Sequence, residues 1–304
     1  PRITGQKAQS LQMRDLLVNA KQQLSKRLVD RGVLEVTLLG QTINHYCYQH
    51  AVGRTTSFAE LLFRIHEEVP HLQRLRFLTS YPRDFTDETL DVMASCDRIC
   101  KYLHIPAQSG SDRILKKMNR GYTRQQYLEL IQRARARMPD ISLLGDMIVG
   151  FSSETQEDFE LSLSLLKQVR YKNVFVFKYS PRPGTVSHRR QADDVPWQVK
   201  QERNRIMLQL QQEISLQHHT CLIGKQLQVL VEAKAKYDPC AVPIQRKATK
   251  RDGSLVRLSA RTQGDHIVAF DGSQDFIGKC VPVRIVGATA LTLRGEKVLQ
   301  EVAT

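Results

Sequence analysis

Short apolar runs alternate with amphipathic stretches through the first two thirds of the chain. Five runs have the length and composition of buried parallel strands, at residues 33–39, 75–78, 102–105, 141–149 and 174–179. The stretches between them predict helices at residues 11–30 and 87–95 and after three N-terminal capping signals, Ser57 with Glu60, Thr123 with Gln126, and Thr155 with Asp158. Strand and helix alternate five times, so we predict an α/β fold with a parallel sheet.

The pattern changes after a long predicted helix at residues 196–218. Five short strands follow, at residues 226–231, 255–260, 266–270, 280–286 and 291–294, with glycines between them. Five such strands in fewer than 90 residues predict a small all-β barrel of the nucleic-acid-binding type. We therefore expect two domains, at residues 1–219 and 220–304.

The charge points to a polyanionic partner. The chain has a net charge of +14, of which the second domain, from Cys221 on, carries +5 with 13 Lys and Arg against 8 Asp and Glu. Nucleic acid is the favoured reading, and a solvated basic surface is the alternative. Four cations gather in one loop of the second domain and suit a phosphate backbone, unless the loop is a solvated hairpin: Arg246, Lys247, Lys250 and Arg251.

No apolar run approaches the roughly 18 residues of a membrane span. The six cysteines (Cys47, Cys96, Cys100, Cys221, Cys240 and Cys280) show no disulfide-like spacing, and no signal peptide is visible, which favours a reducing cytoplasm. Cys96 and Cys100 have a suggestive separation but no third cysteine nearby, so we interpret them as core thiols.

Polar residues and glycines follow the predicted strands. Gly40, Gln41 and Asn44 follow the first, and Gln108-Ser109-Gly110-Ser111 follows the third. Because the carboxyl ends of parallel strands meet at one edge of a sheet, these residues predict a ligand site there. The alternative is that such loops are connections only.

Four segments carry a resemblance to a known family: residues 36–41, residues 104–113 with 118–123, residues 146–151 (Asp-Met-Ile-Val-Gly-Phe) and residues 177–185 (Phe-Lys-Tyr-Ser-Pro-Arg-Pro-Gly-Thr). They resemble the radical-SAM methylthiotransferases, and the C-terminal barrel resembles the TRAM domain of those enzymes. The run through Gln108 is most similar to the tRNA branch, which methylthiolates N6-isopentenyladenosine beside the anticodon.

The resemblance implies a partial TIM-type (β/α) barrel of six units that binds S-adenosylmethionine at its carboxyl rim, beside a 4Fe–4S cluster. A second cluster in an N-terminal domain is implicated in sulfur delivery. It further implies tRNA as substrate and a flavodoxin- or ferredoxin-like electron donor. Reductive cleavage of the sulfonium would give a deoxyadenosyl radical that attacks an unreactive C–H bond.

The sequence departs from the family pattern in the cluster motif. Three cysteines spaced C-x3-C-x2-C would hold the radical-generating cluster, and this chain has no such motif. The preceding domain and the first barrel strand are also missing, so we expect a fragment or truncated product that is inactive alone. The alternatives are a non-catalytic RNA-binding protein, or a methylthiotransferase for another modified adenosine or a ribosomal protein. A smaller departure is Ser152-Ser153, where the family has Pro-Gly before Glu154.

Site residues follow from the resemblance, position by position. Gly40, Gln41 and Asn44 correspond to the place of the amino and carboxylate ends of S-adenosylmethionine, and Gln108 and Ser109 to the ribose. Asp146, Ile148 and Gly150 correspond to the strand beside the adenine, and strand alternation places all three on one face. Gly40 and Gly150 could instead be turn glycines, and Asp146 a buried structural carboxylate. Because a charged group is expensive to bury unpaired, Asp146 should face the polar mouth or meet a partner such as Lys178. Lys178, Arg182 and His188 could face RNA.

Overall fold

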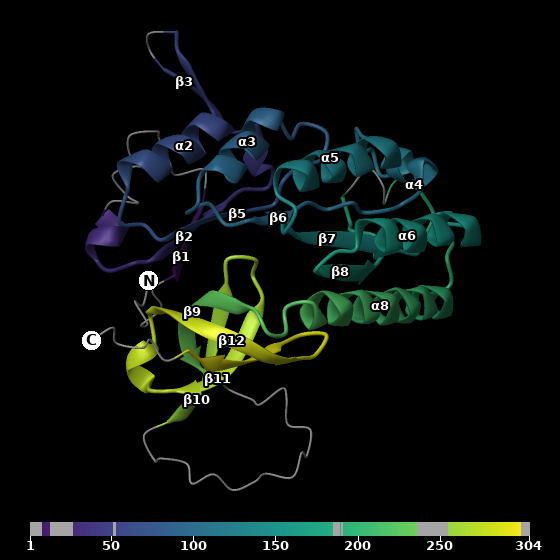
Figure 1. Ribbon diagram of the computed structural model, residues 1–304. Coiled ribbons are helices and arrows are strands. Elements are labelled where there is room, and N and C mark those ends of the chain that lie inside the picture. Colours follow the sequence, from purple (N-terminus) through teal and green to yellow (C-terminus); the bar gives the residue numbers. More distant parts are fainter. Residues whose placement is uncertain are drawn as a thin grey trace, which may run out of the picture.

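The computed structural model describes residues 8–12, 27–50, 53–184, 189, 191–235 and 255–298, and the backbone alone for residues 8–12. These residues form an α/β part and a closed β-barrel, which lies below the α/β part in Figure 1. Helix α8 (Trp197–Thr220) runs along the α/β part and ends beside the barrel. Within these ranges, no helix is both long and apolar enough to cross a membrane.

The α/β part contains two parallel sheets of three strands each. One has the order β1-β2-β5 (Ala8–Gln12, Glu35–Leu39 and Arg74–Leu78), and the other has the order β6-β7-β8 (Tyr102–His104, Ser142–Val149 and Asn173–Lys178). A parallel bridge between Leu75 and Ile99, with a hydrogen bond from Cys100 N to Leu75 O (2.9 Å), joins them. The described strands thus follow one another in chain order, as in a partial (β/α) barrel.

Helices pack against this row of strands: α2 (Phe58–Glu68), α3 (Asp87–Ser95), α4 (Asp112–Lys117), α5 (Arg124–Arg137), α6 (Gln156–Val169) and α8. In Figure 1, α2, α3 and α5 lie above the strands and α8 lies below β8. The predicted capping signals are used. Thr123 with Gln126 and Thr155 with Asp158 form complete capping boxes, and Ser57 accepts a hydrogen bond from the backbone of Glu60. The five predicted strands and the helices that these signals predict are therefore confirmed.

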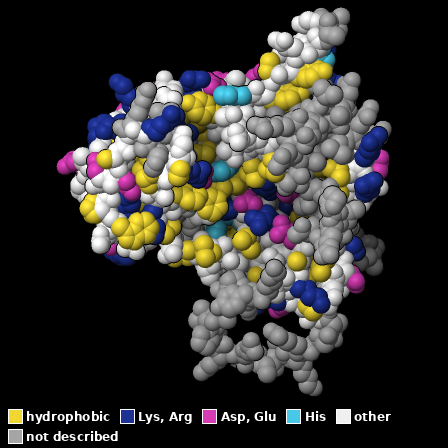
Figure 2. Space-filling view, turned by 180° about the vertical axis from the view of Figure 1, so that it is seen from behind, with side chains coloured by type: hydrophobic (Ala, Val, Ile, Leu, Met, Phe, Trp, Pro, Cys, Tyr) yellow, Lys and Arg dark blue, Asp and Glu magenta, His cyan; other side chains and the backbone are white. Residues whose placement is uncertain are grey.

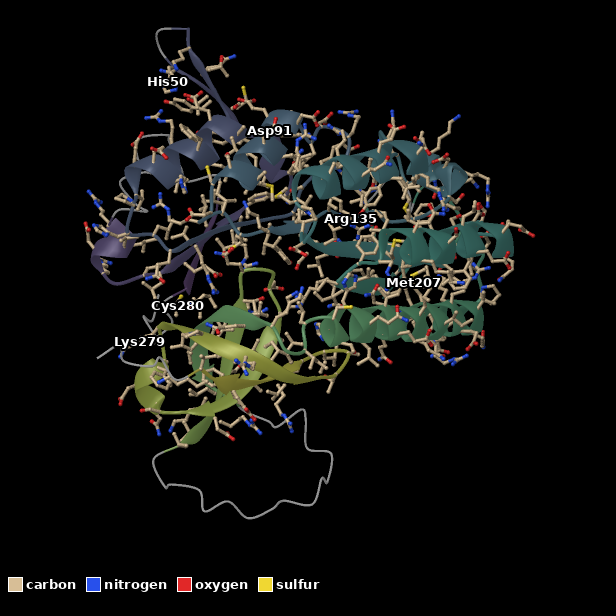
Figure 3. The ribbon with its side chains drawn as sticks, in the orientation of Figure 1. His50, Asp91, Arg135, Met207, Lys279 and Cys280 are labelled. Carbon is tan, nitrogen blue, oxygen red and sulfur yellow. The ribbon has the colours of Figure 1, made fainter. Side chains whose placement is uncertain are left out.

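Strand alternation separates the two faces of the row. Val36, Leu38, Leu75, Phe77, Leu103, Leu143, Met147 and Val149 are buried in one core with the helices. Met207 of α8, between α6 and α8 in Figure 3, belongs to the same core. The alternate residues of each strand lie on the opposite face, which we call the inner face.

Two expectations about the start of the sheet were wrong. Residues 11 and 12, expected in a helix over residues 11–30, belong to strand β1, which pairs in parallel with β2. We also expected the first strand to be missing, whereas β1 extends the row beyond β2. Pairing with the free edge of β2 outweighs the local helical pattern, because tertiary contacts override propensity. Residues 27–30 are helical as expected, and residues 13–26 lie outside the described part.

The C-terminal barrel closes in the order β10-β11-β13-β12-β9, with β9 (Gln226–Lys234), β10 (Val256–Thr262), β11 (Ile267–Gly272), β12 (Cys280–Ala288) and β13 (Leu293–Lys297). Neighbouring strands are antiparallel except β11 and β13, which are parallel. Apolar side chains such as Val231, Phe270 and Val283 fill the interior. The five predicted strands are confirmed. A short hairpin of β3 (Cys47–Gln49) and β4 (Thr55–Ser57) was not predicted.

Two buried arginines, both paired with the buried Glu35, fasten the barrel to the inner face near the amino ends of the strands. Arg74 donates to the carbonyl oxygens of Arg261 (2.7 Å) and Gln228 (2.9 Å) in the barrel. Arg76 donates to Thr262 O (3.3 Å) and to Glu35, whose carboxylate also lies 3.8 Å from Arg74. We call Glu35, Arg74 and Arg76 the arginine lock. It occupies the amino end of the inner face at β2 and β5, and the carboxyl end remains for a site.

Candidate functional site at the carboxyl ends of the strands

The inner face changes character from one end to the other. At the amino end lies the arginine lock, whose Arg76 lies 4.9 Å from the ring centroid of Tyr102. Tyr102 packs with Leu144 in the middle of the face. Towards the carboxyl end lie His104, Asp146 and Ile148, followed on β8 by exposed Phe175 and Phe177. Figure 2 shows, at the centre of the face seen from behind, charged side chains of both signs beside hydrophobic ones. We call the carboxyl ends of these strands, with the loops that follow them, the carboxyl rim.

Asp146 lies on the inner face, as the alternation of β7 predicted. Met147 and Val149 are buried in the helix-covered core, whereas Asp146 and Ile148 are partly exposed. The Asp146 carboxylate lies 3.1 Å from Nε2 of His104 on the neighbouring strand. The expected partner, Lys178, belongs to the other face. A carboxylate and an imidazole therefore stand together at the rim.

The loop after β2 is fastened to the loop after β5. Asn44 donates to the carbonyl oxygen of Tyr81 (3.0 Å) and accepts from the Tyr81 N–H (2.7 Å), while Ile43 N donates to Thr79 O (3.0 Å). Asn44 thus shapes the rim by bonding to the backbone. Gln41 is exposed and Gly40 partly exposed at the end of β2.

The loop after β6 bends back onto β7. Gln108 has a positive φ of 69°, and its backbone bonds to Asp146 O (2.8 Å) and Ile148 N (2.9 Å). An L-residue in this conformation is strained, which is a common feature of functional loops. Ser109 lies elsewhere, because its hydroxyl is buried 3.4 Å from Ser162 Oγ on α6. The structure therefore brings Gln108, but not the Ser109 side chain, to Asp146.

The backbone conformation of Gly150 and its close packing account for a glycine at this position. Its φ is 69°, and a Cβ there would collide with the Lys200 side chain on α8. Glu154 holds the same turn, because its carboxylate accepts from Gly150 N (2.6 Å) and from Arg203 (2.7 Å). Burial raises the pKa of Glu154. Our sequence reasoning named no role for Glu154 or Arg203, since they meet only after α8 folds back.

The turn through Ser152 and Ser153 keeps a glycine-like conformation. Ser153 has a φ of 60°, the left-handed region that favours glycine, at the position where the related family carries Gly. Its backbone N–H donates to Asp194 (2.6 Å), and Arg113 donates to its hydroxyl (3.2 Å). Polar contacts thus hold a serine where a glycine would suit the backbone better.

The predicted RNA contacts are only partly visible. Lys178 lies 4.6 Å from the ring centroid of Trp197, at the start of α8. Arg182 lies in the loop after β8 and is exposed. Five further candidates lie outside the described residues: His188, Arg246, Lys247, Lys250 and Arg251.

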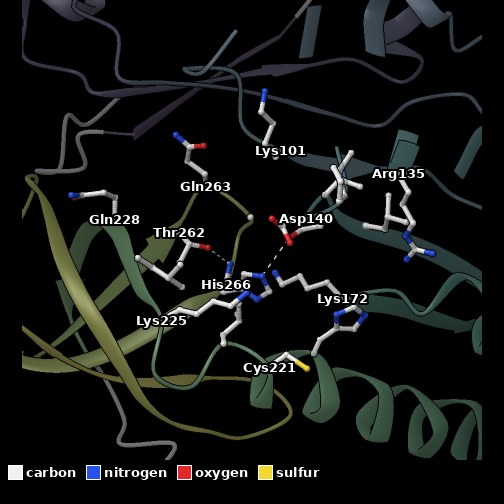
Figure 4. Close-up of a pocket in the computed structure, with 18 of the residues that line it drawn as sticks. Lys101, Arg135, Asp140, Lys172, Cys221, Lys225, Gln228, Thr262, Gln263 and His266 are labelled. Carbon is white, nitrogen blue, oxygen red and sulfur yellow. Dashed lines mark hydrogen bonds between the residues drawn. The ribbon is translucent and has the colours of Figure 1, made fainter. Parts of the chain in front are cut away.

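A cavity of about 630 Å³ lies between the α/β part and the barrel, at the amino ends of β7 and β8. Lys172 and His266 face it from the two parts (Figure 4), and Lys101, Arg135, Arg170 and Lys225 also line it. Several of these cations are already bonded. Lys172 pairs with Asp265 (3.0 Å), and Lys101 donates to the last carbonyls of α3. This cavity lies away from the carboxyl rim and was not predicted.

The cysteines of the described part do not form a cluster site. Within the described residues, no group of three His, Cys, Asp or Glu side chains is placed to hold a metal. Cys96 and Cys100 are buried, as their interpretation as core thiols requires. Burial raises the pKa of Cys100 to about 11, so its thiol is protonated at neutral pH.

Comparisons with known proteins agree with this architecture. The family model of the radical SAM superfamily matches residues 11–166. The tRNA-2-methylthio-N(6)-dimethylallyladenosine synthase of Moorella thermoacetica is 42% identical over 273 residues, 90% of this chain and 57% of that protein. The enzyme of the same name from Porphyromonas gingivalis is 43% identical over 264 residues, 87% of this chain and 53% of its own. The chain therefore spans little more than half the length of these curated relatives.

Among solved structures, coproporphyrinogen III oxidase of Escherichia coli superposes with a TM-score of 0.44 and 19% identity. The match covers 62% of this chain and 44% of that one.

Proposed function

This chain belongs to the radical SAM superfamily, and from that premise we propose that it forms the S-adenosylmethionine-binding and RNA-binding parts of a tRNA methylthiotransferase. Its substrate would be N6-dimethylallyladenosine beside the anticodon. The observation that carries the proposal is the 42% identity over 273 residues to a protein named for this reaction. Residues 1–219 cannot supply an alignment of that length, so the match includes both the α/β part and the barrel.

We place S-adenosylmethionine at the carboxyl rim. Gly40, Gln41 and Asn44 border one side, while Gln108, Asp146, Ile148 and Gly150 border the other. The shared rim supports this placement, since Asn44 joins two of its loops and Gln108 bonds to β7 next to Asp146. Bound there, S-adenosylmethionine supplies the sulfonium whose reductive cleavage can activate a C–H bond, which no side-chain acid or base can do. Ser109 would act only by packing the loop onto α6.

The residues of this chain do not fit the 4Fe–4S cluster of the family. The sequence has no C-x3-C-x2-C motif, and within the described residues no three His, Cys, Asp or Glu side chains are placed to hold a metal. No step of the reaction is therefore assigned to a cluster held by these residues. The proposed reaction requires an electron donor of the flavodoxin or ferredoxin type. Because its substrate is tRNA, we propose that the protein acts in the cytoplasm.

We assign RNA binding chiefly to the barrel. It carries +5 of the net charge, and its strand order with a parallel β11–β13 pair is that of an OB-like fold. The loop with Arg246, Lys247, Lys250 and Arg251 connects β9 to β10, and OB folds use the loop between their first two strands to bind oligonucleotides. Lys178, Arg182 and His188 are candidate contacts nearer the rim.

Nucleoside analysis of tRNA tests the function. The whole gene containing this sequence is expressed in a bacterium whose own methylthiotransferase gene has been deleted, and its tRNA is digested and measured by mass spectrometry. We expect 2-methylthio-N6-dimethylallyladenosine to reappear, and to fall when Asp146 is replaced by Ala. Persistent N6-dimethylallyladenosine alone, with tRNA still bound by the purified protein, would favour the second candidate, a non-catalytic RNA-binding protein. The lack of a three-cysteine motif is the observation that favours that candidate.

A further inference from the structure

Two phenylalanine rings are exposed on the inner face at the carboxyl end of β8. Phe175 is 49% exposed and Phe177 is 54% exposed, and their ring centroids lie 6.5 Å apart with the planes tilted by 38°. Val174 on the same strand is buried among the helices. Because successive side chains of a strand point to opposite faces, the two rings face away from the hydrophobic core.

The register of β7 and β8 fixes what surrounds these rings. Phe175 stands beside Asp146, and Phe177 stands beside Ile148. This surface thus combines a carboxylate with apolar side chains. A purine with an alkyl group on its exocyclic nitrogen likewise combines a polar edge with an apolar substituent. The carboxylate of Asp146, with His104 beside it, suits the polar edge, and the rings suit the alkyl group.

β8 is also the last strand of the described row. The residues that we assign to S-adenosylmethionine lie on or after β2, β6 and β7, so β8 borders the space left for the second reactant. On the basis of the proposed function, we propose that Phe175 and Phe177 contact the dimethylallyl group of the target adenosine. The pair would thereby select prenylated tRNA over unmodified tRNA.

The contrast between two RNAs tests this assignment. Fluorescence anisotropy measures the binding of the full chain to labelled anticodon stem-loops that differ only in carrying N6-dimethylallyladenosine or adenosine. A single buried methylene discriminates by roughly tenfold or more, so we expect at least about tenfold tighter binding of the prenylated RNA. The double variant Phe175→Ala, Phe177→Ala should reduce this ratio to about one and change the affinity for unmodified RNA much less.

Phe63→Ala is the matched control, because Phe63 is 47% exposed on α2 outside the inner face. It should keep the wild-type ratio. A wild-type ratio near one, or a double variant that keeps the ratio, overturns the proposal while leaving the proposed function intact. Loss of affinity for S-adenosylmethionine in the double variant with an unchanged RNA ratio also overturns it, and assigns the rings to that cofactor. Absence of tRNA modification in the nucleoside assay would instead count against the function itself.

Discussion

Replacing Arg74 by methionine tests whether the arginine lock holds the two parts of the protein together. Arg74 is 2% exposed, and its guanidinium makes two hydrogen bonds to barrel carbonyls, at 2.7 and 2.9 Å. Methionine fills much of the same space but donates no hydrogen bond. The variant leaves the Arg261 and Gln228 carbonyls without this donor, and Glu35 with Arg76 as its remaining lock partner.

The size of the effect follows from these contacts. A hydrogen bond to a charged group contributes about 1.5–3 kcal/mol, and buried ion pairs return part of that as desolvation cost. We therefore expect Arg74→Met to lower the free energy of unfolding by about 3 kcal/mol. For a chain of this size, that corresponds to a fall in Tm of about 5 °C.

Two measurements check this expectation. Thermal unfolding followed by circular dichroism gives the change in Tm, and hydrogen exchange should show the β10–β11 hairpin, which includes Asp265, losing protection first. Arg205→Met is the control, because Arg205 makes two hydrogen bonds to Glu202 on an exposed helix surface. It should leave the Tm unchanged. If the Tm of the Arg74→Met protein equals that of the wild type, the lock gives no net stabilisation.

Three further predictions concern pH, a turn and RNA. Burial near Lys172 and His219 lowers the pKa of His266 to about 3, whereas an unfolded histidine titrates near 6.5. Below about pH 6.5 the imidazole of His266 therefore binds a proton in the unfolded chain but not in the folded chain, so the stability of the fold should decrease as the pH drops towards 3. In Tm measurements from pH 7 to 4, His266→Gln should make this decrease smaller. Ser153→Gly should be more stable than Ser153→Ala by about 1 kcal/mol in urea unfolding, because both lose the hydroxyl but only glycine accepts a φ of 60° without strain; equal stabilities would contradict this. Replacing the four loop cations by Ala (Arg246, Lys247, Lys250 and Arg251) should weaken tRNA binding and reduce the slope of log K against log salt by roughly 3. An unchanged slope would show that the loop is solvated and does not contact RNA.

Local patterns in the sequence were sufficient for most of the secondary structure. Alternation and capping residues specify β7 and the starts of α5 and α6 within a few neighbouring residues. β1 escaped prediction because it is formed by pairing with β2, which the residues around Leu11 do not encode. The face on which Asp146 lies could be predicted, because it depends only on alternation along β7. Its partner His104 could not be predicted, because that contact depends on the register between β6 and β7.

Contacts between distant segments account for what the sequence did not predict at the site. Two arginines alternating with apolar residues are typical of a strand with one face in solvent. Arg74 and Arg76 are buried only because the barrel packs against them, which the local sequence does not show. Gly150 and Glu154 acquire their roles from Lys200 and Arg203, about 50 residues later on α8. The family resemblance supplied candidate positions, and the structure separates Asp146, on the inner face, from Ser109, which packs against α6.

The claim that the ligand site lies at the carboxyl rim, and not in the basic cavity at the amino ends, is tested most directly by photoaffinity labelling. The protein encoded by the whole gene is irradiated with an azido analogue of S-adenosylmethionine, and labelled peptides are identified by mass spectrometry with unlabelled cofactor as competitor. We predict competed labels in the rim segments around Gln108 and Asp146. Competed labels concentrated around Lys172 and Lys225 would contradict the account.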